Sequence, residues 1–296
     1  MFKTEISLII PIYRVSKYLS KCLDSLLNQR FDLPYNIILV ETASDDGSDL
    51  ICEKYQKENC DKVYWFHYPK RYSVSMARNL GLLHSNGRFV SFVDGDDLVE
   101  KDFLSTLYNE FLKDEQLQIA FSGYDVISKD GKRKKGFSGS FCGRGRDALK
   151  KYLLHQPRFR GYCRGGLYRR SFLYANRLYF DPEMSLYEDE LFVSKCLFDA
   201  SRVKFVNSVA YHYCYHSSST MNTSKDWLNP HLQCYKKIFS YIKKTDFEFA
   251  SSLFGRCFRA QKKQLKLDCK NSFVFLDMSE KELFRKCLKS YKEIVR

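Results

Sequence analysis

The sequence has few of the residues that interrupt regular structure, with 6 Pro and 14 Gly among 296 residues. It also lacks low-complexity tracts and internal repeats, whereas 44% of its residues are hydrophobic and 16% are aromatic. Disordered and collagen-like chains have the opposite composition. The chain can therefore bury a sizeable core, and its length allows about one or two domains.

Paired cysteines and long apolar runs are also missing. The 11 cysteines include no Cys-x-x-Cys pair and are odd in number, which argues against a zinc ribbon and a secreted disulfide framework. No run approaches the roughly 18 apolar residues of a transmembrane helix, and the six-residue run near the N-terminus is too short for a signal peptide. We therefore expect a cytoplasmic protein without a membrane-spanning helix.

Short apolar runs alternate with stretches of helical periodicity over the first 113 residues. The predicted strands are 6–11, 36–40, 63–66 and 88–93, and the predicted helices are 16–29, 48–58, 75–86 and 101–113. This alternation is typical of βαβ units, so it predicts an α/β fold with a mostly parallel central sheet flanked by helices. Ligands of such sheets bind beyond the carboxyl ends of the strands. The loops after Pro11, Val40 and Val93 are therefore the predicted site.

The pattern changes after Tyr124. A basic turn at 129–136 is followed by two short β runs at 203–206 and 210–215, which we interpret as the second half of the same domain. From residue 225 onward the pattern is mostly helical, and this extension carries 17 Lys/Arg and 8 Asp/Glu, a net +9 of the total +14.

Basic residues in the extension recur at helical spacing, at Arg256, Arg259, Lys263, Lys266 and Lys270. Such a face can dock on an anionic membrane, where each Lys or Arg contributes about 1 kcal/mol. If it docks, we expect the inner face of the cell membrane to be the site. The alternative, a solvated helix face, stays open. No nucleic-acid-binding motif is visible, so we expect no nucleic-acid partner.

Three carboxylates lie within four residues directly after a predicted buried strand, namely Asp94, Asp96 and Asp97 around Gly95. Like charges this close repel one another unless a hard divalent cation lies between them, and oxygen ligands favour Mg²⁺ or Mn²⁺. Gly95 lets the backbone pass close to a ligand. The alternative is that these acids cap the next helix, but their position at the end of a buried strand favours the metal site.

Five segments, taken in order, resemble family 2 glycosyltransferases of the GT-A fold, which are inverting enzymes of bacterial polysaccharide synthesis. They are 7–13 (SLIIPIY), 22–29 (CLDSLLNQ), 77–82 (ARNLGL), 92–97 (FVDGDD) and 187–192 (YEDELF). The resemblance covers about residues 5–220 and implies a glycosyltransferase domain at 1–224, followed by the basic helical extension 225–296. It also implies transfer of a sugar from a nucleotide-diphosphate donor, most often UDP, to a hydroxyl of a glycan or lipid-linked acceptor.

The resemblance further implies roles for individual residues. Asp189 would be the base that activates the acceptor hydroxyl, a weak nucleophile at neutral pH, and Asp96 and His216 would ligate Mn²⁺ or Mg²⁺. Donor-nucleotide contacts are implied for Pro11, Tyr13, Glu41, Thr42, Arg78, Asp94 and Gly95, and acceptor contacts or support for Asp97, Glu188 and Gly166. Three alternatives stay open: a core histidine for His216, a structural ion pair for Arg78 and a solvated helix N-terminus for 188–190.

The sequence departs from the family pattern after the second predicted strand, where Thr42 replaces the second of two acids. A hydroxyl can still accept a hydrogen bond from a nucleobase, but it lacks the charge of a carboxylate. Asp46 could take over this role, although we favour it as a cap of the helix that begins near Ser48. The departure motivates the alternative that the chain is a catalytically silent GT-A-like module that binds glycan or protein.

Overall fold

The computed structural model describes residues 4–137, 139–154, 162–216 and 228–254. The first elements are β1 (Ile6–Ile12), α1 (Ser16–Leu27), β2 (Tyr35–Thr42), α2 (Ser48–Glu58), β3 (Val63–Tyr68), α3 (Val74–His84), β4 (Phe89–Phe92), β5 (Leu98–Val99) and α4 (Phe103–Lys113). They are followed by β6 (Ile119–Ile127), β7 (Arg133–Phe137), β8 (Phe141–Gly143), α5 (Gly145–Leu153), β9 (Gly166–Arg169), α6 (Arg170–Ala175), α7 (Glu188–Asp199), β10 (Val203–Cys214) and α9 (Leu228–Lys243).

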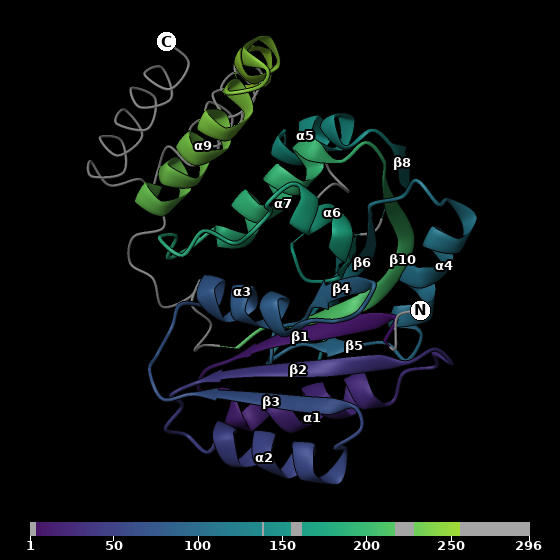
Figure 1. The fold of residues 1–296 in the computed structure, drawn as a ribbon, viewed down its shortest axis with the longest axis vertical. Helices are drawn as coiled ribbons and strands as arrows, with labels where there is room; N and C mark the ends of the chain where they lie inside the picture. The colour runs from purple at the N-terminus through teal and green to yellow at the C-terminus, as the bar shows by residue number, and fades with distance from the viewer. Residues whose placement is uncertain (1–3, 138, 155–161, 217–227, 255–296) are drawn as a thin grey trace.

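The described strands form one sheet in the order β3-β2-β1-β4-β9-β6-β10-β5, with β7 beside β6 and β8 beside β10. Strands β3, β2, β1, β4, β6 and β10 all run in one direction, and the shorter β9, β5, β7 and β8 run the opposite way. Helix α3 covers one face of β1 and β2, while α1 and α2 cover the other (Figure 1). The mostly parallel α/β sheet that the sequence predicts is confirmed.

Side chains of β1 alternate between the two faces of the sheet. Leu8 and Ile10 belong to the core under α1, α2 and α4, whereas Ile9 belongs to the core under α3, α5 and α7. This alternation is the period of a strand, in which successive Cβ atoms point to opposite faces. Helix α3 crosses β1 at Gly81, where a Cβ atom would lie 2.2 Å from a methyl carbon of Ile9. Only glycine permits this close approach.

The strand register brings the predicted loops to one edge of the sheet. Ile12 at the end of β1 pairs with Glu41 near the end of β2, and Ile9 pairs with Phe92 at the end of β4. Since these strands are parallel, the loops that follow them meet beyond their carboxyl ends.

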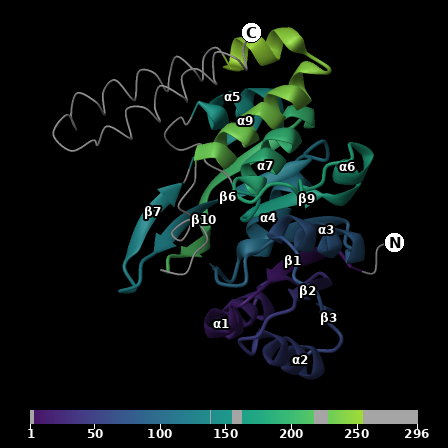
Figure 2. The same ribbon diagram turned by 90° about the vertical axis from the view of Figure 1, so that its left-hand side faces the viewer.

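The second half differs from the prediction in two places. The two short β runs at 203–206 and 210–215 form the single strand β10, which carries bulges between Phe205 and Tyr211. The basic turn at 129–136 forms the tip of the hairpin β6–β7 and most of β7 itself, and this hairpin extends from the body (Figure 2). A bulge adds a residue that breaks the period-2 pattern, and this is why one strand looks like two in the sequence.

The extension after residue 225 begins with α9, which packs on α7. Tyr235, Ile238 and Phe254 are at most 1% exposed and join the core that contains Phe192 of α7. Residues 256–270, which carry the basic series, lie outside the described residues. No helix that the structure describes has both the length and the apolar character to cross a membrane.

Candidate active site

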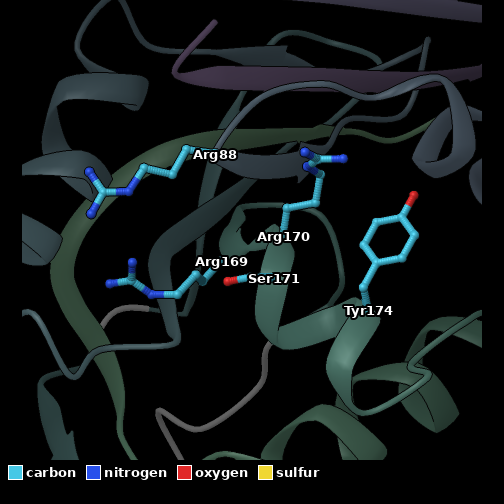
Figure 3. Close-up of a pocket in the computed structure, with 5 residues that line it drawn as sticks. All are labelled: Arg88, Arg169, Arg170, Ser171 and Tyr174. Atoms are coloured by element: carbon cyan, nitrogen blue, oxygen red, sulfur yellow. The ribbon is translucent and has the colours of Figure 1, made fainter. Parts of the chain in front are cut away.

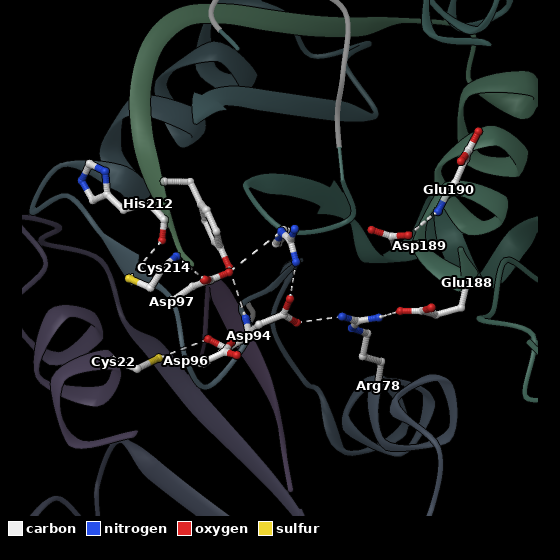
Figure 4. Close-up of polar contacts among 12 residues, drawn as sticks. Cys22, Arg78, Asp94, Asp96, Asp97, Glu188, Asp189, Glu190, His212 and Cys214 are labelled. Atoms are coloured by element: carbon white, nitrogen blue, oxygen red, sulfur yellow. Dashed lines mark hydrogen bonds and ion pairs between the residues drawn. The ribbon is translucent and has the colours of Figure 1, made fainter. Parts of the chain in front are cut away.

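Asp94 lies just beyond the end of β4 and is held by two arginines (Figure 4). Arg78 of α3 donates to one carboxylate oxygen at 2.7 Å, and Arg164, which precedes β9, donates to the other at 2.7 Å. Burial raises the pKa of Asp94, but the two guanidinium charges outweigh it and lower the pKa to about 2. Asp94 is therefore ionised, with its charge already balanced by protein cations.

Asp97 is fully buried and supports the same loop from behind. Its carboxylate accepts a 2.7 Å hydrogen bond from the Tyr211 hydroxyl and a 2.9 Å bond from the backbone N–H of Cys214. Tyr211 in turn accepts from the backbone N–H of Asp94. Burial raises the pKa of Asp97 well above its usual range. These contacts tie the loop to β10, which fits the supporting role implied for Asp97.

Asp96 and His216 come together at the mouth of the loop. The His216 Nε2 atom lies 2.7 Å from a carboxylate oxygen of Asp96, although the two residues are 120 positions apart. The His216 ring stacks on Tyr18 of α1 at a centroid distance of 4.5 Å. Burial, and then the charge of Asp94, raise the pKa of Asp96. Both side chains are partly exposed, at 22% and 12%, so they can reach a ligand.

Arg78 joins the loop to the start of α7. Its guanidinium donates to Asp94 and, at 2.8 Å, to Glu188, and the residue is only 3% exposed. Burial, and then the charge of Asp189, raise the pKa of Glu188, and Arg78 opposes this shift. In this structure Arg78 forms buried ion pairs with Asp94 and Glu188. Glu188 therefore helps to position the loop through Arg78.

Asp189 is the second residue of α7, and its carboxylate accepts a 2.8 Å hydrogen bond from the backbone N–H of Glu190. Figure 4 shows the Asp189 side chain turned toward the side on which Asp94 lies, whereas Glu190 points away. Acids are favoured in the first turn of a helix by the helix dipole. Glu188, Asp189 and Glu190 thus point in three directions. Of the three, Asp189 faces the site and makes no hydrogen bond to an arginine among the described residues.

The residues expected to contact the nucleotide lie at the ends of β1 and β2. The Tyr13 ring has the Arg71 guanidinium 4.5 Å from its centroid, and Pro11 beside it is partly exposed. Thr42 is 1% exposed. Glu41 is fully buried, where its oxygens meet the Ser44 backbone N–H at 2.6 Å and His67 Nδ1 at 2.5 Å.

The buried carboxylate of Glu41 thus braces the turn after β2. Asp46 accepts hydrogen bonds from the backbone and hydroxyl of Ser48 and from the backbone N–H of Ser16, so it fixes the starts of α2 and α1. This geometry agrees with the capping interpretation of Asp46.

Two glycines named from the sequence have steric roles. A Cβ at Gly95 would lie 3.2 Å from a Val15 methyl group, so the Asp94–Asp97 loop passes close to the start of α1. A Cβ at Gly166 would lie 2.9 Å from the rings of Phe121 and Tyr168, inside the sheet. Gly166 therefore packs in the core between these two rings.

Three site residues were not singled out from the sequence. Arg164 clamps Asp94 and is itself sandwiched by the rings of Tyr162 and Tyr213, at 4.4 and 4.6 Å. Tyr211 bridges two loop aspartates, and Tyr18 stacks on His216. The one signal available was the charge of Arg164 directly before a Gly-Gly pair, since a buried arginine requires an acidic partner.

The side chains around the loop can be compared with those that a divalent cation requires. Among the described residues no group of three or more His, Cys, Asp and Glu side chains is placed to hold a metal. Asp94 and Asp97 are already satisfied by arginine, tyrosine and backbone donors, which leaves Asp96 with His216. One carboxylate and one imidazole fit an ion that takes its other ligands from phosphate oxygens and water, as Mg²⁺ does at phosphate sites. Asp96 and His216, the two residues implied as metal ligands, are thus the pair that stays open to an ion, while Asp94 and Asp97 face protein donors.

Residues 7–175 match the family model described as "Glycosyl transferase family 2". EpsJ of Bacillus subtilis strain 168, an uncharacterized glycosyltransferase, is 30% identical over 235 residues, which are 77% of this chain and 66% of EpsJ. TarS of Staphylococcus aureus strain Mu50, a poly(ribitol-phosphate) beta-N-acetylglucosaminyltransferase, is 30% identical over 212 residues, 71% of this chain and 35% of TarS.

The crystal structure of residues 1–349 of S. aureus TarS in complex with UDP-GlcNAc has the same fold, with a TM-score of 0.76 at 21% identity, and covers 99% of this chain and 82% of that one. The chain spans about two thirds of EpsJ and about one third of TarS. The matched segment includes β1 to β4, the Asp94–Asp97 loop and Arg164. The chain belongs to glycosyl transferase family 2 and has the GT-A fold.

Proposed function

We propose that the chain is an inverting glycosyltransferase that moves a sugar from a UDP-sugar to a hydroxyl of a glycan or lipid-linked saccharide in cell-surface polymer synthesis. One observation carries the proposal: Arg78 joins Asp94, after β4, to Glu188, at the start of α7, so Asp189 and Asp96 open on the same edge of the sheet. Family membership and the UDP-GlcNAc named for the TarS crystal structure support a nucleotide-sugar donor.

Asp189 is the proposed base. It accepts the proton of the acceptor hydroxyl while that oxygen bonds to the anomeric carbon and the bond to the diphosphate breaks on the opposite face. A single displacement of this kind inverts the configuration. A base must lie within hydrogen-bond reach of the proton that it removes, and Asp189 faces the loop while its neighbour Glu188 is engaged by Arg78.

Asp96 and His216 are the proposed ligands of a Mn²⁺ or Mg²⁺ ion. Such an ion, when bound, acts as a Lewis acid that offsets the negative charge of the departing diphosphate. The protein prepares the position: Arg78 and Arg164 hold Asp94, Tyr211 holds Asp97, and Asp96 is thereby presented beside His216.

The acceptor side is proposed from chemistry and relatives alone. TarS is named for transfer to poly(ribitol phosphate), and we extend to this chain only a hydroxyl-bearing polymer or its lipid-linked precursor. If the acceptor is lipid-linked, the proposed partner of the basic residues in 225–296 is an anionic membrane surface, to which each Lys or Arg would contribute about 1 kcal/mol.

The test uses the full chain with Mn²⁺ and a panel of nucleotide sugars, read as released nucleoside diphosphate. We expect one UDP-sugar to be hydrolysed or transferred above the others, and proton NMR of the product to give the inverted anomer. The silent-module alternative is favoured by Thr42, which replaces an acid of the family pattern. Calorimetry separates the two, because a silent module shows no binding of any donor with Mn²⁺.

A further inference from the structure

A cavity lined by three arginines lies beyond the opposite end of β4 from the Asp94 loop. Its volume is about 300 Å³, and the residues that line it are Arg88, Arg169, Arg170, Ser171 and Tyr174 (Figure 3). Arg88 directly precedes β4, whereas Asp94 lies beyond the other end of that strand, so six residues of near-extended chain, roughly 20 Å at about 3.3 Å per residue, separate the two. We call this cavity the arginine pocket.

The guanidinium groups of Arg169 and Arg170 are fixed by neutral partners. Arg169 donates to the backbone carbonyls of Leu117 and Glu115 at 3.1 and 3.0 Å. Arg170 donates to two carbonyls in the turn before β4, at 2.7 and 3.1 Å. Carbonyl partners orient a guanidinium without neutralising its charge, so both arginines are held in fixed orientations.

Three arginines line the pocket, and the nearby carboxylates are those of Glu5 and Glu115. Among the described residues, the ion pair of Arg88 with Glu5, at 3.3 Å, is the one between a pocket arginine and a carboxylate. Arg88 and Arg169 lie 5.2 and 5.3 Å from the centroid of the same Phe89 ring. Burial, and then the charge of Arg88, lower the pKa of Arg169; the charges of Glu115 and Glu5 act in the opposite direction and only partly offset them.

Figure 3 shows the guanidinium groups of Arg88 and Arg169 on one side of the pocket with the Ser171 hydroxyl directed to that side, and Arg170 and Tyr174 on the other. We propose that the arginine pocket binds the oxyanion of a phosphate group through Arg88, Arg169 and the hydroxyl of Ser171. Arginine suits phosphate because its planar fork donates two parallel, charge-assisted hydrogen bonds. A hydroxyl donor adds a third contact.

A purely structural role explains part of the cluster. It accounts for the atoms of Arg169 and Arg170 that hold carbonyls, but Arg88 holds no carbonyl in the described structure and is 45% exposed. It also leaves unexplained why like charges meet over one aromatic ring. An anion in the pocket removes that repulsion, and its position across the sheet separates it from the diphosphate of the donor.

The test is calorimetric titration of the full chain with inorganic phosphate, with and without UDP and Mn²⁺. We expect saturable binding that UDP does not displace. Arg88→Gln is expected to weaken it by about tenfold, as loss of a charge-assisted hydrogen bond does, and Ser171→Ala by a smaller factor. Arg30→Gln, at an exposed arginine after α1, is the matched control and should leave phosphate binding unchanged.

The phosphate has two chemical sources, free phosphate and a phosphodiester, and a parallel titration with a small glycerol phosphodiester distinguishes them. Equal or tighter binding of the diester assigns the pocket to a phosphodiester polymer, and binding of inorganic phosphate alone assigns it to the free dianion. Absence of saturable binding at millimolar phosphate, displacement by UDP, or unchanged binding in Arg88→Gln overturns the proposal. None of these outcomes depends on sugar transfer, so the proposed function stands or falls separately.

Discussion

Arg78 and Glu188 are 110 positions apart in the chain and form an ion pair of 2.8 Å, buried between α3 and α7. The same guanidinium reaches Asp94 at 2.7 Å, so its width sets the spacing between the β4 loop and the first turn of α7. Buried charges of this kind are weak sources of net stability but costly to break. The pair therefore fixes the relative position of the two acidic segments that the proposed reaction requires.

Arg78→Met tests this arrangement. It leaves buried Glu188 without its cation and Asp94 with Arg164 alone, so the free energy of unfolding should fall by about 3–5 kcal/mol, and sugar transfer should be lost. Urea denaturation measures the change. Arg202→Met is the control, because Arg202 pairs with Asp114 at the surface with 44% of its side chain exposed, where such pairs contribute about 0–1 kcal/mol. A stability of Arg78→Met equal to that of the control would contradict the bridging role.

Asp189→Asn tests the proposed base. Asparagine keeps the shape but cannot take a proton at neutral pH, so kcat should fall by about 10²–10⁴ while the Kd for the donor sugar stays near that of the wild type. Glu190→Gln, one position along and turned away from the site (Figure 4), is the matched control and should keep its kcat. Undiminished turnover by Asp189→Asn would show that another group takes the proton.

The first half of the fold was predictable because it is built from local βα units. Helix 48–58 was predicted at its observed bounds, and β1 and β3 began at the predicted residues. Strand β9 was not predicted, because its four residues obtain their place from pairing with β4 and β6, far away in the sequence. Hydrophobic period reports on local structure and cannot reveal such non-local partners.

The acidic residues of the candidate site were identified from the sequence, but the division of work among them was not. The pattern suggested three carboxylates around one metal ion, whereas Asp94 faces two arginines and Asp97 faces Tyr211. Which acid receives an internal cation depends on distant elements, here α3 and the segment before β9. Motif spacing therefore predicts where the carboxylates cluster. Which of them stays accessible to a ligand depends on the arginine and tyrosine side chains that pair with the others.

His216→Gln tests the second metal ligand. Loss of the imidazole beside Asp96 should raise the Mn²⁺ concentration needed for half-maximal UDP binding by about 10–100-fold, the range seen when support of a metal site is removed. Calorimetry of UDP at increasing Mn²⁺ measures it. His84→Gln serves as control because His84 stacks on Phe66, away from the loop. Identical Mn²⁺ dependence in the two variants would leave Asp96 as the sole proposed ligand.

The contact of α9 with the segment before α7 predicts a pH dependence of stability. Lys237 of α9 lies 2.7 Å from Asp181 and 2.8 Å from Glu183. Burial raises the pKa of Asp181, but the hydrogen bonds from Lys237 and the Glu183 backbone, together with the charge of Lys237, outweigh it, so the pKa is lowered. Burial lowers the pKa of Lys237, and its bonds to the two acids outweigh this and raise it.

The sign follows from these directions. The contribution of Asp181 is complete above its unfolded pKa of about 3.9 and is lost as the pH falls through the lower folded value, while that of Lys237 is complete below about 10.4 and is lost at higher pH. Lys237→Gln should therefore lower the free energy of unfolding most between about pH 5 and pH 9, and the difference from the wild type should shrink below about pH 4. Urea denaturation across this range measures it, with the neighbouring exposed Lys236→Gln as control. A difference that does not change with pH would mean that Lys237 holds α9 through its alkyl chain and not through its charge.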